Sequence, residues 1–196
     1  ATTLGGAFVS MDTEHPTARV VLEGGQYVDL TWLRDGDIEA DLQGRDFTIN
    51  SMAAPLRTDP VGWLEALSVG GSRDLIDPFG GQEDLWSRRV RMVAPGAFRS
   101  DPLRLLRAVR FRAELGFEID ALTLEQMRRD SGLLARPAAE RVRDELCRIL
   151  AASGAGGNLR LLNDLGLLRH IIPELESLKG VLQPPEHHWD VFEHSL

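Results

Sequence analysis

The sequence predicts an α+β protein whose strands precede its helices. The first third contains short runs of β-branched and aromatic residues separated by glycines. Beyond residue 92, apolar side chains recur at spacings of three and four, which is typical of amphipathic helices. The 196 residues are 43% hydrophobic and 27% charged, the composition of a soluble chain with one core or two small ones.

Residues 18–22 and 26–30 are the predicted strands, and the glycine pair between them is a hairpin signal. Apolar and polar residues alternate from Val28 to Trp32. Because neighbouring side chains of a strand point to opposite faces, we expect one covered face on this sheet.

Asp37 can cap a short helix that runs to Leu42. The segment GRDFTINSMA (44–53) follows, and its alternation suggests a junction between a strand and a helix. Phe47 and Ile49 are its predicted core residues.

Residues 55–81 are rich in proline and glycine, which predicts turns and short strands at an edge. The first long helix follows: Ser100 or Asp101 can cap it, Pro102 suits its first turn, and Gly116 can end it.

Three more helical segments are expected. Thr123 with Gln126 has the spacing of a capping box for the first. Pro137 opens the second, which the sequence GAGG ends, and further helices are predicted at 158–165 and 167–179. The sequence QPPEHH, from residue 183 on, is typical of a linker.

Composition limits the class of protein. The single cysteine, Cys147, excludes an intrachain disulfide and is predicted as a small core residue. Neither a leader sequence nor an apolar run of about 20 residues is present. We therefore expect a cytoplasmic protein without a membrane partner.

The net charge of −8 argues against an indiscriminate nucleic-acid binder. The distribution is uneven, however, because residues 88–112 contain eight arginines and one acid, Asp101. An acidic protein thus carries one basic island.

Within this island, Asp101, Arg104 and Arg107 form a polar stripe along the predicted helix. Leu105, Leu106 and Val109 form the inward side, with Leu103 and Arg110 near the edge. An Asp/Arg pair can read the polar edge of a base, and further arginines can hold a triphosphate. The alternative is an exposed helix stabilised by ion pairs.

Five ordered segments resemble the bacterial tRNA nucleotidyltransferase/poly(A) polymerase family, which includes the class II CCA-adding enzymes. They are GRDFTINSMA (44–53), LIDPFGGQEDL (75–85), AFRSDPLRLLRAVRFRAELGF (97–117), ERVRDEL (140–146) and HHWDVFEHSL (187–196). The resemblance implies an incomplete nucleotidyltransferase head sheet (1–92), an all-helical, RNA-binding neck (93–182) and the start of an HD-type domain (183–196).

The resemblance also implies roles for residues of the first segment. Arg45 would contact the incoming nucleotide, and Asp46 and Asn50 would shape the junction. The residues by themselves also allow an ion pair at Arg45, a helix cap at Asp46 and a turn at Asn50.

On the long helix, Asp101 and Arg104 match a motif in which two side chains read the base of ATP or CTP in place of a nucleic-acid template. Arg107 and Arg110 match nucleotide-contacting arginines. In ERVRDEL, three residues are expected to brace one helix against another: Arg141, Arg143 and Glu145.

Family members hold two Mg²⁺ ions with an Asp-x-Asp strand that follows a Gly-Gly loop. Neither feature is visible: Gly5 and Gly6 have different neighbours, and Asp35 and Asp37 lie in a polar turn. We therefore assign no catalytic and no metal-binding residue to this chain, and expect Mg²⁺ only in the complete enzyme.

The last segment resembles the entry to an HD-type domain, whose later His-Asp pair is absent; its residues are His187, His188, Asp190 and His194. Two positions depart from the family pattern: Gly44 replaces a basic residue and Ser100 replaces an acid.

The sequence thus predicts a fragment of a template-independent RNA nucleotidyltransferase, inactive as it stands. The complete enzyme would add CMP and AMP, or AMP alone, to the 3′ end of tRNA or another RNA. Two alternatives are a non-catalytic nucleotide- or RNA-binding module and an HD-type phosphohydrolase.

Overall fold

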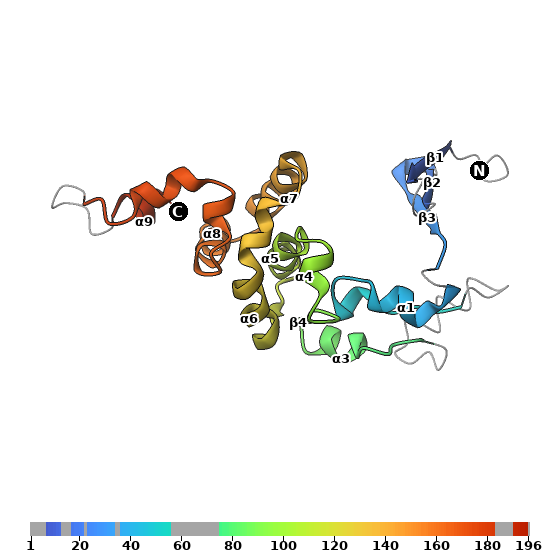
Figure 1. The fold of residues 1–196 in the computed structure, drawn as a ribbon. Coiled ribbons are helices and arrows are strands. Elements are labelled where there is room, and N and C mark those ends of the chain that lie inside the picture. Colours follow the sequence, from blue (N-terminus) through green and yellow to red (C-terminus); the bar gives the residue numbers. More distant parts are fainter. Residues whose placement is uncertain are drawn as a thin grey trace. The chain divides into compact units, whose positions relative to one another are not determined.

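The computed structural model describes residues 7–12, 17–21, 23–33, 36–55, 75–182 and 190–195 (Figure 1). The chain forms two compact units, Ala1–Gly44 and Arg45–Leu196. The predicted linker from residue 183 and most of the proline-rich region at 55–81 lie outside the described residues.

The first unit contains an antiparallel sheet in the order β1-β2-β3. Its strands are β1 (Ala7–Asp12), β2 (Thr17–Val21) and β3 (Tyr27–Thr31). Gly24 and Gly25, both at φ +80°, form the turn between β2 and β3, so the predicted hairpin is confirmed.

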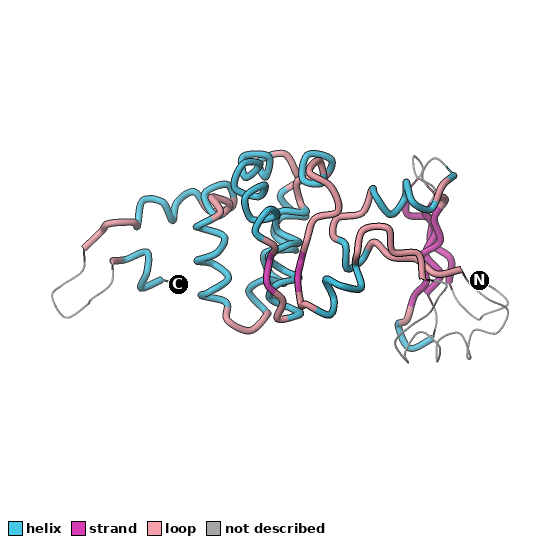
Figure 2. The backbone as a smooth tube through the Cα atoms, turned by 90° about the horizontal axis from the view of Figure 1, so that it is seen from below, coloured by secondary structure: helices cyan, strands magenta, loops and turns pink. Residues whose placement is uncertain are grey.

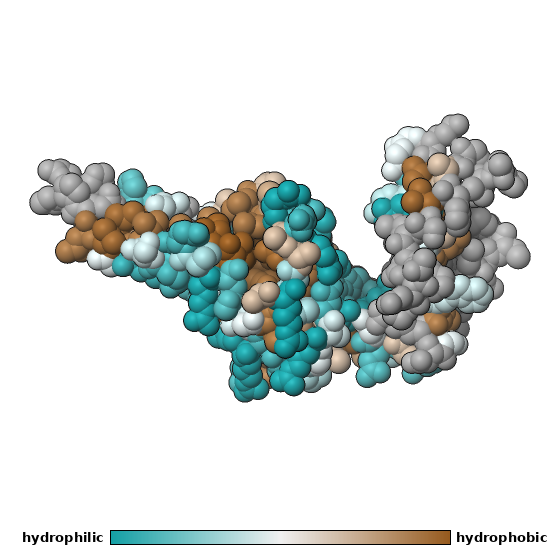
Figure 3. Space-filling model, turned by 45° about the horizontal axis from the view of Figure 1, so that its top comes forward, coloured by the Kyte–Doolittle hydropathy of each residue, from teal (hydrophilic) through white to brown (hydrophobic). Residues whose placement is uncertain are grey.

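The prediction that one face of this sheet is covered is wrong. Val28, Leu30 and Trp32 are 48%, 55% and 77% exposed, and Figure 3 shows apolar surface among the described residues of this unit. Alternation along a strand creates an apolar face, but only a second layer can bury it.

Helix α1 (Ile38–Gln43) completes the described part of the first unit. The carboxylate of Asp37 accepts hydrogen bonds from the backbone N–H groups of Glu39 and Ala40, at 3.4 and 3.3 Å. The predicted cap is therefore confirmed.

The second unit is mostly helical. Its α-helices are α3 (Gly81–Trp86), α4 (Ala97–Ser100), α5 (Arg104–Leu115), α6 (Ala121–Asp130), α7 (Ala139–Ala151), α8 (Ala155–Asp164) and α9 (Val191–Ser195). Its 3₁₀ helices are η4 (Thr48–Asn50), η5 (Ser131–Ala135), η6 (Leu168–His170) and η7 (Pro173–Leu178). Two short parallel strands, β4 (Arg89–Val90) and β5 (Glu118–Ile119), lie side by side among them (Figure 2).

Helix α5 lies at the centre of this unit and packs against α7 and α8. Leu105, Leu106 and Val109 are fully buried, which confirms the predicted inward side of the helix. Leu103 and Arg110, predicted near the edge, are also buried, because α7 covers the side of α5 that carries Arg110.

Only the C-terminal end of α5 follows the prediction. The helix begins at Arg104, and its N-cap, Leu103, makes no side-chain cap hydrogen bond. Asp101 precedes the helix with extended backbone dihedrals and accepts the N–H of Leu103 at 3.2 Å, so the predicted polar stripe on the helix itself consists of Arg104 and Arg107. Gly116 ends the helix at φ +67°, a backbone conformation that favours glycine.

The predicted capping box of α6 is wrong. Asp120 caps this helix by accepting the N–H groups of Leu122 and Thr123, at 3.0 and 3.2 Å. Thr123 is buried inside the first turn, where its hydroxyl oxygen accepts the N–H of Met92 at 3.1 Å.

Two predictions about the later helices also need correction. The GAGG sequence was expected to lie between two helices, but only its first residue does. Gly154, at φ +74°, precedes α8, and Gly156 and Gly157 lie inside this helix. Residues 167–179 form η6 and η7 in place of one helix. Ile172 has non-helical dihedrals, φ −135° and ψ 76°, because it precedes Pro173, which disfavours the helical conformation at the residue before it.

Cys147 is exposed, contrary to the expected core position. On α7, Val142, Leu146 and Ile149 pack against the core. Cys147 directly follows Leu146 in the sequence, and the rotation of about 100° per residue places it on the outward side of the helix.

Candidate functional site

The junction 44–53 is anchored from one side by α3. The carboxylate of Asp77 accepts the N–H groups of Gly81 and Gln82 at 2.6 and 2.9 Å, and so caps α3. The backbone of Gly81 lies against the carbonyl oxygen of Thr48, so closely that a Cβ atom at residue 81 would lie 2.2 Å from it. The DPFGG sequence therefore lets a helix approach the junction.

A buried carboxylate strengthens this anchor. Asp84 is 1% exposed and accepts hydrogen bonds from the Thr48 hydroxyl at 2.6 Å and from Nε of Arg91 at 2.7 Å. Since an unpaired buried charge is unfavourable, these bonds favour one position of the junction.

Helix α5 holds the junction from the other side. Side chains on successive turns of α5 contact three consecutive junction residues: Arg104 contacts Arg45, Arg107 contacts Asp46, and Phe111 contacts Phe47. The partners are about 60 positions apart in the sequence, so the tertiary structure brings together two segments that were interpreted separately. We call this set of contacts the α5 clasp.

Asp46 is the buried member of the α5 clasp. It is 5% exposed; its Oδ2 accepts Nε of Arg107 at 2.6 Å, and its Oδ1 accepts the N–H of Phe47 at 3.0 Å. Oδ1 of Asn50 accepts the same N–H at 3.2 Å. Asp46 and Asn50 thus fix the backbone of the junction around Phe47, whose ring is fully buried.

The side chain of Arg104 contacts the backbone of the junction. Its Nη1 donates to the carbonyl oxygen of Arg45 at 3.0 Å and to that of Ala97 at 3.4 Å. Arg45 itself is an exposed residue.

The predicted base-reading Asp101 lies one turn before Arg104 and is partly exposed. Its Oδ2 lies 3.1 Å from Nη2 of Arg141 on α7. Arg141 therefore links α7 to the turn between α4 and α5, whereas the ERVRDEL segment was expected to brace helix against helix.

Arg110 is enclosed by protein. Its side chain is 6% exposed, with Nε 2.7 Å from Oε2 of Glu145 and Nη1 3.0 Å from Oε2 of Glu114. The close approach to Glu145 is an ion pair without the alignment of a hydrogen bond. The guanidinium also lies 4.4 Å from the Phe111 ring centre. Glu145 thus braces α7 as predicted.

The third residue expected to brace the helices does not do so. Arg143 pairs with Asp144 on the same helix, at 2.9 Å. Its side chain is 68% exposed, which is the position of a solvated surface residue.

The positive charge of the basic island (residues 88–112) is partly balanced by acidic side chains from other parts of the chain. Most of its arginines reach polar or acidic partners outside residues 88–112: Arg91 with Asp84, Arg99 with Asp130, Arg107 with Asp46, Arg110 with Glu145, and Arg112 with Asn158. Sequence reasoning missed these partners because each lies outside the element that carries its arginine, and all but Asp84 lie far away in the chain, where helical periodicity gives no signal.

Two family models match the chain. One, described as "Poly A polymerase head domain", matches residues 6–91, and the other, "Probable RNA and SrmB- binding site of polymerase A", matches residues 116–179. The CC-adding tRNA nucleotidyltransferase of Geobacter sulfurreducens is 46% identical over 151 residues, which are 76% of this chain and 32% of that protein. The A-adding tRNA nucleotidyltransferase of Deinococcus radiodurans is 38% identical over 100% of this chain and 42% of that protein.

A solved structure agrees with these matches. The CCA-adding enzyme of Thermotoga maritima, complexed with tRNA, superposes with a TM-score of 0.72 at 31% identity, over 94% of this chain and 41% of that one. The chain belongs to the bacterial tRNA nucleotidyltransferase/poly(A) polymerase family. It spans less than half the length of each of these relatives.

The Mg²⁺ ions implied by the tRNA nucleotidyltransferase family do not fit the described residues. Asp29 lies on a strand, β3, as the metal-binding aspartates of the family do, but both of its carboxylate oxygens bind Arg19 at 2.7 Å. This hydrogen bonding lowers the pKa of Asp29 and raises that of Arg19. Within the described ranges, His, Cys, Asp and Glu side chains form no group of three that could hold a metal.

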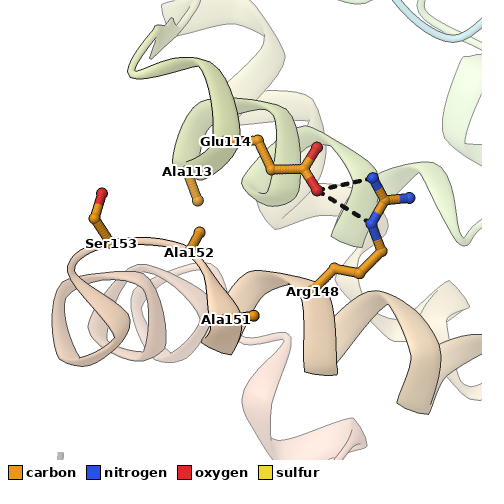
Figure 4. Close-up of a pocket in the computed structure, with 6 residues that line it drawn as sticks. All are labelled: Ala113, Glu114, Arg148, Ala151, Ala152 and Ser153. Carbon is orange, nitrogen blue, oxygen red and sulfur yellow. Dashed lines mark hydrogen bonds and ion pairs between the residues drawn. The ribbon is translucent and has the colours of Figure 1, made fainter.

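A hollow of about 320 Å³ lies where α5 and α7 end (Figure 4). Glu114 and Arg148 form an ion pair of 2.8 Å at one side of it, and Ser153 lies at the other. None of the residues expected to contact the nucleotide lines this hollow. The described helices include none with both the length and the apolar character needed to cross a bilayer.

Proposed function

We propose that the protein containing this chain is a template-independent nucleotidyltransferase that extends the 3′ end of tRNA or another RNA. It adds CMP and AMP, or AMP alone, from CTP and ATP. The terminal hydroxyl of the RNA attacks the α-phosphate of the nucleotide and gives up its proton to solvent, while the bond from the α-phosphorus to the β-phosphate oxygen breaks and pyrophosphate leaves. The protein contributes by positioning the reactants and stabilising charge.

The α5 clasp is the observation that supports this proposal. It joins the junction that carries Arg45 to α5, which begins at Arg104 shortly after Asp101. Arg45, Asp101 and Arg104 each keep part of their surface exposed. A donor and an acceptor for a base edge, with a further cation, are thus held on one supported framework.

The chemistry of base selection follows from these side chains. A carboxylate accepts a hydrogen bond from an exocyclic amino group, and a guanidinium donates to ring nitrogens and carbonyl oxygens. The backbone N–H of Arg104 donates to the carbonyl oxygen of Asp101 at 3.1 Å, which keeps the two residues close, so in the proposal their side chains meet different atoms of the same base. Arg107, with 34% of its side chain exposed, contacts the nucleotide from the next turn.

Arg110 takes a different part in the proposal. Because Glu114, Glu145 and the Phe111 ring surround its guanidinium, we assign it to holding α5 on α7. The direct nucleotide contact expected from the resemblance would require it to leave two acidic partners.

The remaining features belong to the same proposal. In the proposal the chain has three parts: a nucleotidyltransferase head (1–92), an RNA-binding neck (93–182) and the start of an HD-type domain (183–196). In the complete protein, ATP binds with Mg²⁺ whose ligands lie outside the described residues. A cytoplasmic location goes with it, because bacterial tRNA is matured there.

The choice of nucleotide requires an experiment, since the chain resembles both a CC-adding and an A-adding relative. Protein from the longest natural reading frame that contains this chain would be incubated with tRNA lacking its last three nucleotides and, separately, with tRNA ending in CC. CTP, ATP or both would be supplied, and the products sequenced.

Each product pattern has a distinct meaning. Extension of the first tRNA by CCA indicates a CCA-adding enzyme, and extension of only the second indicates an A-adding one. Long adenosine tails indicate a poly(A) polymerase. Absence of extension, together with retained binding of nucleotide or RNA, would favour the non-catalytic module, whereas phosphate release without extension would favour the HD-type hydrolase.

A further inference from the structure

Arg141 contacts the residue that reads the base in the proposed function. Its Nη2 lies 3.1 Å from Oδ2 of Asp101, and the other carboxylate oxygen accepts the N–H of Leu103 at 3.2 Å. Each oxygen of Asp101 therefore has one donor from the protein. A carboxylate offers about four acceptor sites, so each oxygen can still accept another hydrogen bond.

We propose that Arg141 is a positioning residue for nucleotide selection. It fixes the rotation of the Asp101 carboxylate, so that the remaining lone pairs face the amino group of the incoming base. This inference rests on the proposed function, in which Asp101 reads the base edge.

The geometry explains why a second donor matters. Rotation of an Asp carboxylate about its last torsion is soft, and the Leu103 N–H restrains only Oδ1. Arg141 adds a restraint on Oδ2 from another helix, and the two donors together define the plane of the carboxylate.

The surroundings leave this contact in place. The neighbouring Ser100, which replaces an acid of the family pattern, directs its hydroxyl to the carbonyl oxygen of Ala97 at 2.9 Å. Ser100 thus places no carboxylate beside Asp101 to compete for the Arg141 guanidinium.

Arg141 is not required to dock α7 on α5. The buried pair of Arg110 and Glu145 joins the same two helices, and the side chain of Arg141 is 55% exposed. Exposed ion pairs contribute little to stability. Replacement of Arg141 should therefore change the orientation of Asp101 and leave the fold intact.

The test compares Arg141→Ala and Arg141→Lys in protein from the longest natural reading frame. Single-nucleotide addition would be measured with CTP and with ATP. For Arg141→Ala we expect a rise of about two- to fivefold in the KM of the correct nucleotide, the range that a pair of this kind can account for. The kcat should change little, discrimination between CTP and ATP should fall, and lysine should restore part of the loss.

Arg143→Ala is the matched control, because Arg143 lies on the same helix, is exposed and pairs locally with Asp144. It should leave the KM and discrimination unchanged. Equal effects of the Arg141 and Arg143 variants would overturn the inference, as would weaker RNA binding by Arg141→Ala in a filter assay. Should Arg141→Ala unfold, the lysine variant, which keeps the charge, would decide between these outcomes.

Asp101→Ala separates this inference from the proposed function. If Arg141 acts through Asp101, adding Arg141→Ala to Asp101→Ala should have no further effect on nucleotide selection. An undiminished effect in the double variant would overturn the positioning role and leave the proposed function standing. Unchanged selection in Asp101→Ala alone would instead remove the base-reading role, and the inference with it.

Discussion

Arg107 and Asp46 form an ion pair in which Nε lies 2.6 Å from Oδ2, although the residues are 61 positions apart in the sequence. Asp46 is buried and Arg107 is partly exposed. One arginine of the polar stripe therefore holds the neighbouring junction in place while part of its side chain remains exposed. The proposed binding surface and the folded structure depend on the same side chain.

Arg107→Ala should destabilise the protein by about 1–3 kcal/mol, because it leaves the buried Asp46 carboxylate without its charged partner. Urea unfolding would measure the change. Arg129→Ala is the control: Arg129 pairs with Glu125 on the exposed surface of α6, and its loss should stay within about 0.5 kcal/mol. Equal changes would show that the α5 clasp does not contribute to stability.

Asp101→Ala and Arg104→Ala should each impair the choice between CTP and ATP more than they impair RNA binding. Loss of a hydrogen bond to a charged group corresponds to about 1.5–3 kcal/mol, or roughly 10- to 150-fold in discrimination. Primer extension with single nucleotides and filter binding with tRNA would measure the two effects. Unchanged discrimination in both variants would contradict the base-reading role.

Gly81→Ala should be destabilising because its Cβ would lie 2.2 Å from the Thr48 carbonyl oxygen and 2.9 Å from the Met52 side chain. Overpacking of this kind costs about 1–3 kcal/mol. Gly157→Ala, inside α8 and without a neighbour within 4 Å of the new Cβ, should stabilise by about 0.4–1 kcal/mol. Thermal unfolding of both variants tests the contrast, and a neutral Gly81→Ala would contradict it.

Asp190 should make the start of α9 sensitive to acid. The backbone N–H groups of Glu193 and Gly180 donate to its carboxylate and hold its pKa below the usual value. An unfolded Asp titrates near pH 3.9. Because the folded carboxyl binds its proton less tightly, its contribution is complete above about pH 3.9 and is lost as the pH falls through the lowered pKa.

Amide hydrogen exchange at Gly180 and Glu193 would report this loss, after correction for the intrinsic pH dependence of exchange. Protection should decrease across that acidic range in the natural protein and should not titrate there in Asp190→Asn. The same acid-dependent loss in the variant would assign the effect to another group.

The sequence by itself determined the features that depend on near neighbours. The hairpin at Gly24 and Gly25, the cap at Asp37 and the end of α5 at Gly116 follow from backbone preferences within a few residues. The inward side of α5 follows from the helical period. The family resemblance rested on local motifs in their order, and the comparisons confirmed it.

Only the tertiary structure decided which charges meet. The partners of Asp46 and Asp101, and the buried partner of Arg110, Glu145, lie tens of residues away, so no local pattern could predict them. Burial was decided in the same way, since the apolar face of β3 stays exposed while Arg110 is enclosed. Periodicity states which face a side chain occupies, whereas burial and ion pairing depend on what packs against that face.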